Sequence, residues 1–91
     1  MATVRLAPVL RPSAGGSKQV SAEGSNLTEV LNDLYARFPA LKEQIQTGDQ
    51  LSRYINVYVN DQDVRFLKGL ETQVGTGDTV ILLPAMAGGE L

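Results

Sequence analysis

The stretch NLTEVLNDLYARFP, residues 26–39, decides the fold more than any other part of the chain. Asn26 is suited to cap a helix, and Glu29 three residues later completes a capping-box pair. Pro39 disfavours helical geometry at the residue before it and so ends or interrupts the helix. The apolar residues between these signals recur at helical spacing and share one stripe: Leu27, Val30, Leu31, Leu34, Tyr35 and Phe38.

The chain on either side of this helix offers the surface on which its apolar stripe must pack. Leu41 and Ile45 allow one further helical turn before Gly48. The other apolar segments are short and mostly alternate with polar residues, which is typical of strands with one buried face. A helix with a single apolar side is therefore expected to lie across a sheet.

Two strands are expected before the helix. Residues 3–10 alternate, with Val4, Leu6 and Leu10 on one side, so we predict a strand over that range. Pro12 and the following Ser, Ala and Gly residues indicate a loop. Residues 18–22 supply a short second strand through Val20, which completes an N-terminal hairpin.

Three further strands are expected after the helix. Residues 54–60 alternate through Ile55, Val57 and Val59, and the turn at residues 60–63 leads into a return strand that begins at residues 64–66. Residues 79–83, TVILL, form a nearly unbroken apolar run, which is typical of a strand that is central or buried on both faces. Pro84 stops this strand.

This order of elements predicts an α+β fold in which one main helix packs across a mixed sheet of four or five strands. Residues 1–84 form one domain. Residues 85–91 have small side chains, two adjacent glycines and no periodicity, so we expect a flexible C-terminal tail that contains the Gly-Gly pair.

Composition excludes most enzyme chemistries. The 91 residues include neither cysteine nor histidine, which removes thiolate chemistry, Cys-type zinc sites and the commonest acid–base side chain. The net charge of −2, without a basic cluster, argues against a nucleic-acid partner. No segment indicates a signal peptide or a membrane anchor. We expect a cytoplasmic, monomeric protein that binds no cofactor or metal.

Several residue groups that could carry chemistry have simpler structural interpretations. The pairs Asp61/Asp63 and Glu29/Asp33 could bind a metal, but a turn and a solvated helix face explain them better. The Gly75–Gly77 pair lacks the helix and lysine of a phosphate loop, so we expect a tight turn. Three aromatic residues are expected to pack on the sheet rather than to bind bases or sugars: Tyr54, Tyr58 and Phe66.

The tail is different, because fold stability does not explain Gly88 and Gly89. Glycine is costly to order, and no turn is needed after the last strand. A tail without Cβ atoms can enter a narrow channel in another protein. An unstructured chain end is the alternative, and the residues alone leave both interpretations open.

Three segments together resemble the MoaD/ThiS sulfur-carrier family, which has the ubiquitin-like β-grasp fold. They are YINVYVND at 54–61, GDTVILLP at 77–84 and AGG at 87–89. The long loop at Gly15 and Gly16 and the segment at 63–66 resemble its CysO-like branch most. The resemblance covers the whole domain in order.

The resemblance implies a carrier and not an enzyme. An E1-like enzyme adenylates the Gly89 carboxylate with ATP, and a sulfur donor converts it to a thiocarboxylate. Gly88, Ala87 and Met86 would be the part of the tail that partners recognise. In the CysO-like branch the sulfur goes to a PLP-dependent cysteine synthase, and a zinc-dependent JAMM-type metallopeptidase later releases cysteine.

Glu90 and Leu91 depart from the family pattern, because they leave the Gly89 carbonyl in a peptide bond. We favour a dipeptide that is removed between Gly89 and Glu90. A remnant of protein expression and a degenerate member that only binds partners are the alternatives. Two other functions share the fold: a ubiquitin-like modifier joined to lysines, and a non-catalytic interaction module.

Overall fold

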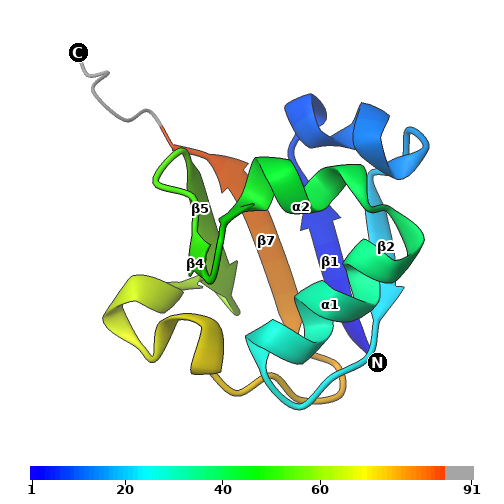
Figure 1. Ribbon diagram of the computed structural model, residues 1–91. Coiled ribbons are helices and arrows are strands. Elements are labelled where there is room, and N and C mark those ends of the chain that lie inside the picture. The colour runs from blue at the N-terminus through cyan, green and yellow to red at the C-terminus, as the bar shows by residue number, and fades with distance from the viewer. Residues whose placement is uncertain (86–91) are drawn as a thin grey trace.

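The computed structural model describes residues 1–85, in which five strands form one mixed sheet. The strands are β1 (Ala2–Leu6), β2 (Gln19–Ala22), β5 (Ile55–Val59), β6 (Gln62–Asp63) and β7 (Thr79–Pro84). Their order across the sheet is β2-β1-β7-β5-β6. The pair β1–β7 is parallel, and the remaining neighbours are antiparallel. The last strand is therefore central, as its apolar run predicts (Figure 1).

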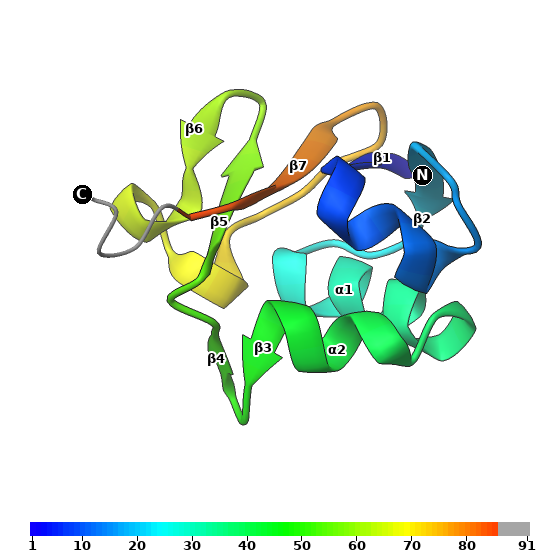
Figure 2. The same cartoon turned by 90° about the horizontal axis from the view of Figure 1, so that it is seen from above.

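Helix α1 (Leu27–Arg37) and the shorter α2 (Ala40–Ile45) lie on one face of this sheet (Figure 2). The Asn26 side chain accepts a hydrogen bond from the Glu29 backbone N–H at 2.9 Å, and Glu29 Oε1 accepts one from the Ser25 N–H at 2.7 Å. These bonds satisfy N–H groups that a helix start leaves without partners. The predicted main helix and its N-cap are thus confirmed, as is the extra turn through Leu41 and Ile45.

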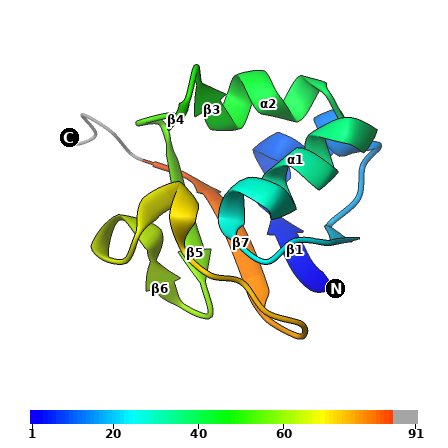
Figure 3. The ribbon, with the colours of Figure 1, turned by 60° about the horizontal axis from the view of Figure 1, so that its bottom comes forward.

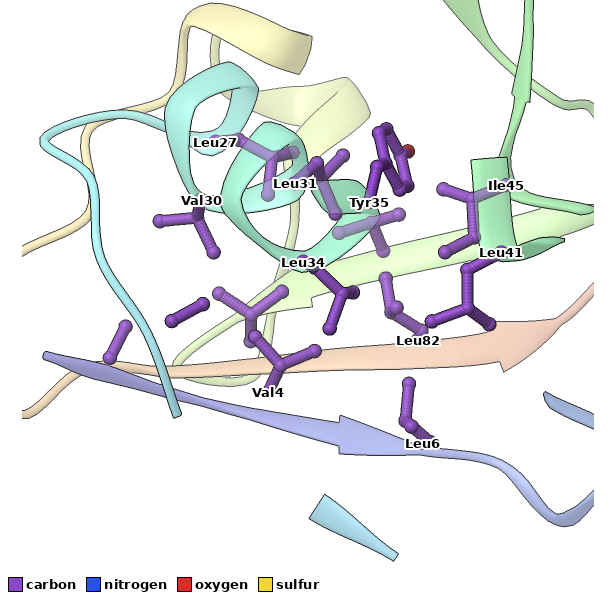
Figure 4. Close-up of a cluster of buried hydrophobic side chains, with 14 of the residues drawn as sticks. Val4, Leu6, Leu27, Val30, Leu31, Leu34, Tyr35, Leu41, Ile45 and Leu82 are labelled. Atoms are coloured by element: carbon purple, nitrogen blue, oxygen red, sulfur yellow. The ribbon is translucent and has the colours of Figure 1, made fainter. Parts of the chain in front are cut away.

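The core lies between α1 and the sheet (Figure 4). Leu27, Val30, Leu31 and Leu34 point from the helix toward Val4, Leu6 and Leu82 of the strands, and all are 0–3% exposed. The Tyr35 ring lies beside Ile45 of α2 in the same cluster. Its hydroxyl has no hydrogen-bond partner within the described residues, and burial raises its pKa.

Two strand predictions are wrong in extent. The first strand ends at Leu6, and residues Pro8–Ala14 form the 3-10 helix η1. Pro8 has no N–H for a strand ladder, and Leu10 reaches the core from η1 rather than from a strand. Residues Val64–Phe66 form the 3-10 helix η2, because the Asp63 side chain accepts a hydrogen bond from the Arg65 N–H. The return strand is limited to β6.

A second, two-stranded sheet was not anticipated. It pairs β3 (Gln46–Thr47) with β4 (Gln50–Leu51) just after α2, as Figure 3 shows. A further 3-10 helix, η3 (Gly69–Glu71), precedes the turn into β7. The arrangement of one helical layer on a five-stranded mixed sheet is the ubiquitin-like β-grasp that we expect. Within residues 1–85, none of the helices combines the length and apolar character needed to cross a membrane.

Candidate functional site

The residues expected to carry the chemistry lie outside the described part of the chain. They are Met86, Ala87, Gly88, Gly89 and Glu90. What the structure describes is the segment that leads to them, which we call the tail root: Leu83, Pro84 and Ala85. The geometry of this root decides where anything beyond residue 85 starts.

The tail root is fixed by β5. Pro84 pairs with Ile55 at the end of the β5–β7 ladder, and the Ala85 N–H donates a 2.8 Å hydrogen bond to the Tyr54 carbonyl oxygen. On the other side of β7, the Leu82 carbonyl accepts a hydrogen bond from the Ala7 N–H at 3.1 Å. Ala85, which the sequence places in the tail, is therefore still held by the sheet. The expected flexibility of the residues beyond it stays a prediction.

Tyr54 is itself braced from the preceding turn. The Arg53 guanidinium lies 5.2 Å from the centre of the Tyr54 ring and donates to its hydroxyl at 3.2 Å. The Tyr54 N–H donates to the Ser52 hydroxyl at 3.1 Å, and Ser52 is buried. These contacts fix the carbonyl that receives Ala85, so the direction of the tail root is determined by residues 52–54.

The face of the sheet away from the helices, which we call the open face, continues from the tail root. Side chains alternate along a strand, so Val80 and Leu82 enter the core whereas Ile81 and Leu83 lie on the open face. The register places Tyr58 and Arg5 on either side of Ile81. Leu83 is 40% exposed although it is a large apolar residue. An apolar strip therefore leads along β7 to the tail root.

A polar cluster borders this strip on the β6 side. Arg65 donates to Asp63 at 2.9 Å and to the Asn56 side chain at 2.6 Å. The hydrogen bonds from Arg65 hold the pKa of the Asp63 carboxyl below its usual range. Asp63 is therefore a structural carboxylate, as the turn interpretation predicts.

The other acidic residues considered as chemical groups also have structural partners. Glu29 caps α1, and Asp33 accepts the Glu23 N–H and forms an ion pair with Arg37 at 3.2 Å. Asp61 occupies a turn with a φ of 72°. Residues 1–85 contain no group of three or more His, Cys, Asp or Glu residues placed to hold a metal ion.

The glycine pair at 75–77 forms the tight turn that we expect. The Asp78 carboxylate accepts a 2.7 Å hydrogen bond from the Gly75 N–H, which lowers the pKa of Asp78. Gly77 has a φ of 89°, a conformation that glycine adopts without steric cost. The chain then enters β7 directly.

The expectation for the three aromatic residues is wrong for two of them. Tyr58 is half-buried on the open face, but Tyr54 is 57% exposed and Phe66 is 87% exposed. Phe66 extends from η2, where the 3-10 turn buries Val64 instead. Tyr54 lies at the tail root, and Phe66 directly follows Arg65 of the Asp63–Arg65 cluster.

The residues that hold the tail root cannot be recognised from the amino-acid sequence. Arg53, Tyr54 and Ser52 act through a backbone bond to Ala85, a residue far away along the chain. The sequence shows only that Arg53 and Tyr54 directly precede an apolar strand. It does not show which other strand will pair with that one.

The fold, with its last strand at the centre of the mixed sheet, defines a class of protein: the ubiquitin-like β-grasp domains. The ThiS family matches residues 4–89. The sulfur carrier protein CysO of Mycobacterium tuberculosis (strain CDC 1551 / Oshkosh) is 46% identical over 90 residues, which cover 96% of this chain and 97% of that protein.

Solved structures give the same result. The match to the Amycolatopsis orientalis BexX/CysO complex has a TM-score of 0.91 and 44% identity, and it covers 93% of this chain and 96% of that one. Small archaeal modifier protein 1 of Methanosarcina acetivorans matches with a TM-score of 0.84 and 34% identity, over 97% and 95% of the two chains. The chain belongs to the ThiS family of small sulfur carriers, which are not themselves catalysts, and is similar to its CysO members.

Proposed function

We propose that this protein carries sulfur as a thiocarboxylate on Gly89. The observation that carries the proposal is the family match, which runs through the domain and ends at Gly89. The tail root supports it, because β7 brings the chain to Ala85 at the edge of the open face, four residues before Gly89. A chain without cysteine would then hold its sulfur on the backbone terminus.

The activation step explains why ATP is needed. A carboxylate is a poor acyl donor, so an E1-like partner joins the Gly89 carboxylate to the α-phosphate of ATP and releases pyrophosphate. A sulfur nucleophile then attacks the acyl carbon, and AMP leaves with one carboxylate oxygen. ATP is bound by the partner, and the carrier contributes the carboxylate and a tail thin enough to reach the active site.

The reach of the tail is limited by the tail root. Because Ala85 is hydrogen-bonded to Tyr54, extension beyond it involves four residues, 86–89, which span at most about 14 Å. The domain must therefore dock close to the mouth of the partner's channel. Gly88 and Gly89 lack Cβ atoms that would obstruct a narrow passage, and Met86 and Ala87 would be the part that the partner recognises.

Removal of Glu90 and the residue after it is part of the proposal, because adenylation requires a free carboxylate on Gly89. A JAMM-type zinc peptidase is the expected processing partner. A PLP-dependent synthase that adds the sulfur to an activated serine derivative is the expected acceptor in cysteine biosynthesis. The solved Amycolatopsis orientalis relative was crystallised with BexX, which supports stable complexes between such carriers and other proteins.

The deciding experiment is intact mass spectrometry. Protein that ends at Gly89 is incubated with its cognate adenylating enzyme, ATP and sulfide, and we expect a mass increase equal to the exchange of one oxygen for sulfur. Deletion of Gly89 should abolish the increase and leave thermal stability unchanged. Gly75→Ala, in the turn at the opposite end of β7 from the tail root, is the control that should still react. No ATP-dependent mass change for the unaltered Gly89 form would contradict the proposal.

Conjugation to lysine is the second candidate function, favoured by the similarity to small archaeal modifier protein 1. The activation step would be identical, but the acyl carbon would pass to a lysine amine. Covalent adducts in the producing cell, with an isopeptide bond at Gly89 in tryptic peptides, would support this candidate.

A further inference from the structure

Three cationic side chains line one pocket that reaches Leu83 of the tail root. Arg5, Arg11 and Lys18 line a pocket of about 340 Å³ that also includes Ile81 and Leu83 of β7. Among residues 1–85, which the structure describes, no acidic side chain lines this pocket. We call it the cationic pocket.

The fold brings these residues together from three segments. Arg5 lies on β1 opposite Ile81, and Leu6 donates its N–H to the Lys18 carbonyl at 2.9 Å, which places Lys18 beside it. Arg11 comes from η1, and its Nε donates to the Leu6 carbonyl at 3.1 Å. The ion pairs within residues 1–85 are Arg37–Asp33 and Arg65–Asp63, so these three cations are not neutralised there.

The opposite end of the sheet is acidic. Glu23 and Glu29 line a pocket at the start of β1. Asp78 and Asp61 belong to the turns at that same end, where the Thr3 N–H donates to the Asp78 carbonyl and the Asn60 N–H to the Thr79 carbonyl. The chain has a net charge of −2. The four acidic residues named here lie at the start of β7, and the three cations of the pocket lie toward the end of β7 that leads to the tail root.

Such a separation has a physical cost, because three like charges placed together repel one another. It also creates a field that orients the molecule as it approaches a partner and raises the rate of association. The apolar Ile81 and Leu83 beside the cations suit a protein interface, in which an apolar centre is bordered by polar groups. Three cations are few for a nucleic-acid site, which usually neutralises many phosphates.

We propose that the cationic pocket docks an acidic protein surface that borders the channel into which the tail is inserted. The occupant is a partner protein with carboxylates at the mouth of its channel and an apolar contact for Leu83. The inference rests on the proposed function, and it further specifies that the partner surface is negatively charged. With at most about 14 Å of tail beyond Ala85, that mouth must lie against this end of the domain.

Matched charge reversals test the proposal. The double variant Arg5→Glu/Lys18→Glu reverses two charges in the cationic pocket, and Lys42→Glu/Lys68→Glu makes the same change in net charge elsewhere. Arg11 is left intact because its side chain bonds to the backbone. Association of each protein with the cognate adenylating enzyme is measured without ATP, at low and at high salt.

We expect the pocket variant to associate about tenfold more slowly at low salt, with most of the difference removed at high salt, and the control to change by less than about twofold. Carboxylate-to-lysine changes at the partner's channel mouth should restore the rate. Equal losses in both variants would indicate a general charge effect and overturn the proposal, as would no loss in either. Binding of a uridine homopolymer RNA that only the pocket variant loses would assign the pocket to nucleic acid and also overturn it.

The two proposals fail separately. Binding is measured without ATP, so it reports on the pocket whether or not sulfur is transferred. If wild type gains sulfur and the pocket variant associates normally, the docking inference alone is wrong. If the pocket variant associates slowly but wild type gains no sulfur, the thiocarboxylate function alone is wrong.

Discussion

Neighbouring residues on the same strands serve different purposes on the two faces of the sheet. Toward the helices, Val4, Val80 and Leu82 are fully buried. Toward solvent, Arg5, Ile81 and Leu83 form the cationic pocket and the strip that leads to the tail root. Because side chains alternate with a period of two, a residue that stabilises the core is followed directly by one that is available for recognition. Changes on one face should therefore leave the other largely unaffected.

The largest effect is expected for Leu82→Ala on the buried face. Leu82 is 0% exposed and packs against α1, so truncation leaves a cavity and lowers the free energy of unfolding by about 2–5 kcal/mol. Urea denaturation measures this loss. A loss below about 1 kcal/mol would mean that the core can collapse around the missing side chain and would weaken the contrast between the faces.

Gly24→Ala should be the next most damaging, because it affects how the helical layer closes onto the sheet. A Cβ atom at Gly24 would lie 2.6 Å from the Val30 backbone nitrogen and 2.7 Å from the Glu29 Cβ. The first turn of α1 would have to shift, at a cost of about 1–3 kcal/mol.

Gly75→Ala is the matched control for this clash. Its added methyl would meet the Asp78 carboxylate at 3.6 Å, an ordinary contact, so its thermal unfolding should resemble wild type. Equal stability of the two alanine variants would show that the loop before α1 adjusts freely.

A smaller, pH-dependent effect is expected for Asp78→Asn at the acidic end. Hydrogen bonds from Gly75 and Asn60 lower the pKa of Asp78, so the ionised form stabilises the fold. That stabilisation is present above the unfolded pKa, about 3.9, and is lost as the pH falls through the lower folded pKa. The stability difference between wild type and variant should be constant from about pH 5 to 8 and shrink below about pH 4. A difference that is the same at every pH would contradict the assignment.

Leu83→Ala should have the smallest effect on stability. Leu83 follows Leu82 directly but lies on the open face, so we expect a loss of about 0.5 kcal/mol or less. Binding to the adenylating enzyme, measured alongside urea denaturation, should weaken instead. A loss of stability as large as that of Leu82→Ala would remove the distinction between the two faces.

The sequence predicts correctly those helices and strands whose start, stop and apolar pattern lie within the element itself. The helix from Leu27 to Arg37 has its own cap, its own apolar stripe and a proline stop, so it was predicted almost to the residue. The alternation of residues 3–10 was misleading because Leu10 is buried by η1 and not by a strand. The prediction of a return strand at residues 64–66 is wrong because the Asp63 side chain caps a 3-10 turn there.

The candidate site likewise has a part that the sequence predicts and a part that it does not. The glycines of the tail can be recognised from the sequence, because no turn there explains the conformational entropy that glycine loses on ordering. The tail root and the cationic pocket cannot be predicted from the sequence. Tyr54 bonds to Ala85, and Lys18 and Leu83 line one pocket, only because the folded sheet brings distant segments together. Arg5, Arg11 and Lys18 appear as scattered single charges in the sequence.

The parallel pairing of β1 with β7 has a mechanical consequence. The two strands are neighbours that run in the same direction, so stretching the chain between its N-terminal end and Ala85 loads their hydrogen bonds in shear. Bonds loaded this way must give way together, whereas a peeled pair opens one bond at a time. Because β7 is also bonded to β5, a force applied to the tail meets two ladders at once. We therefore expect the domain to resist unfolding when a force pulls on its C-terminal end.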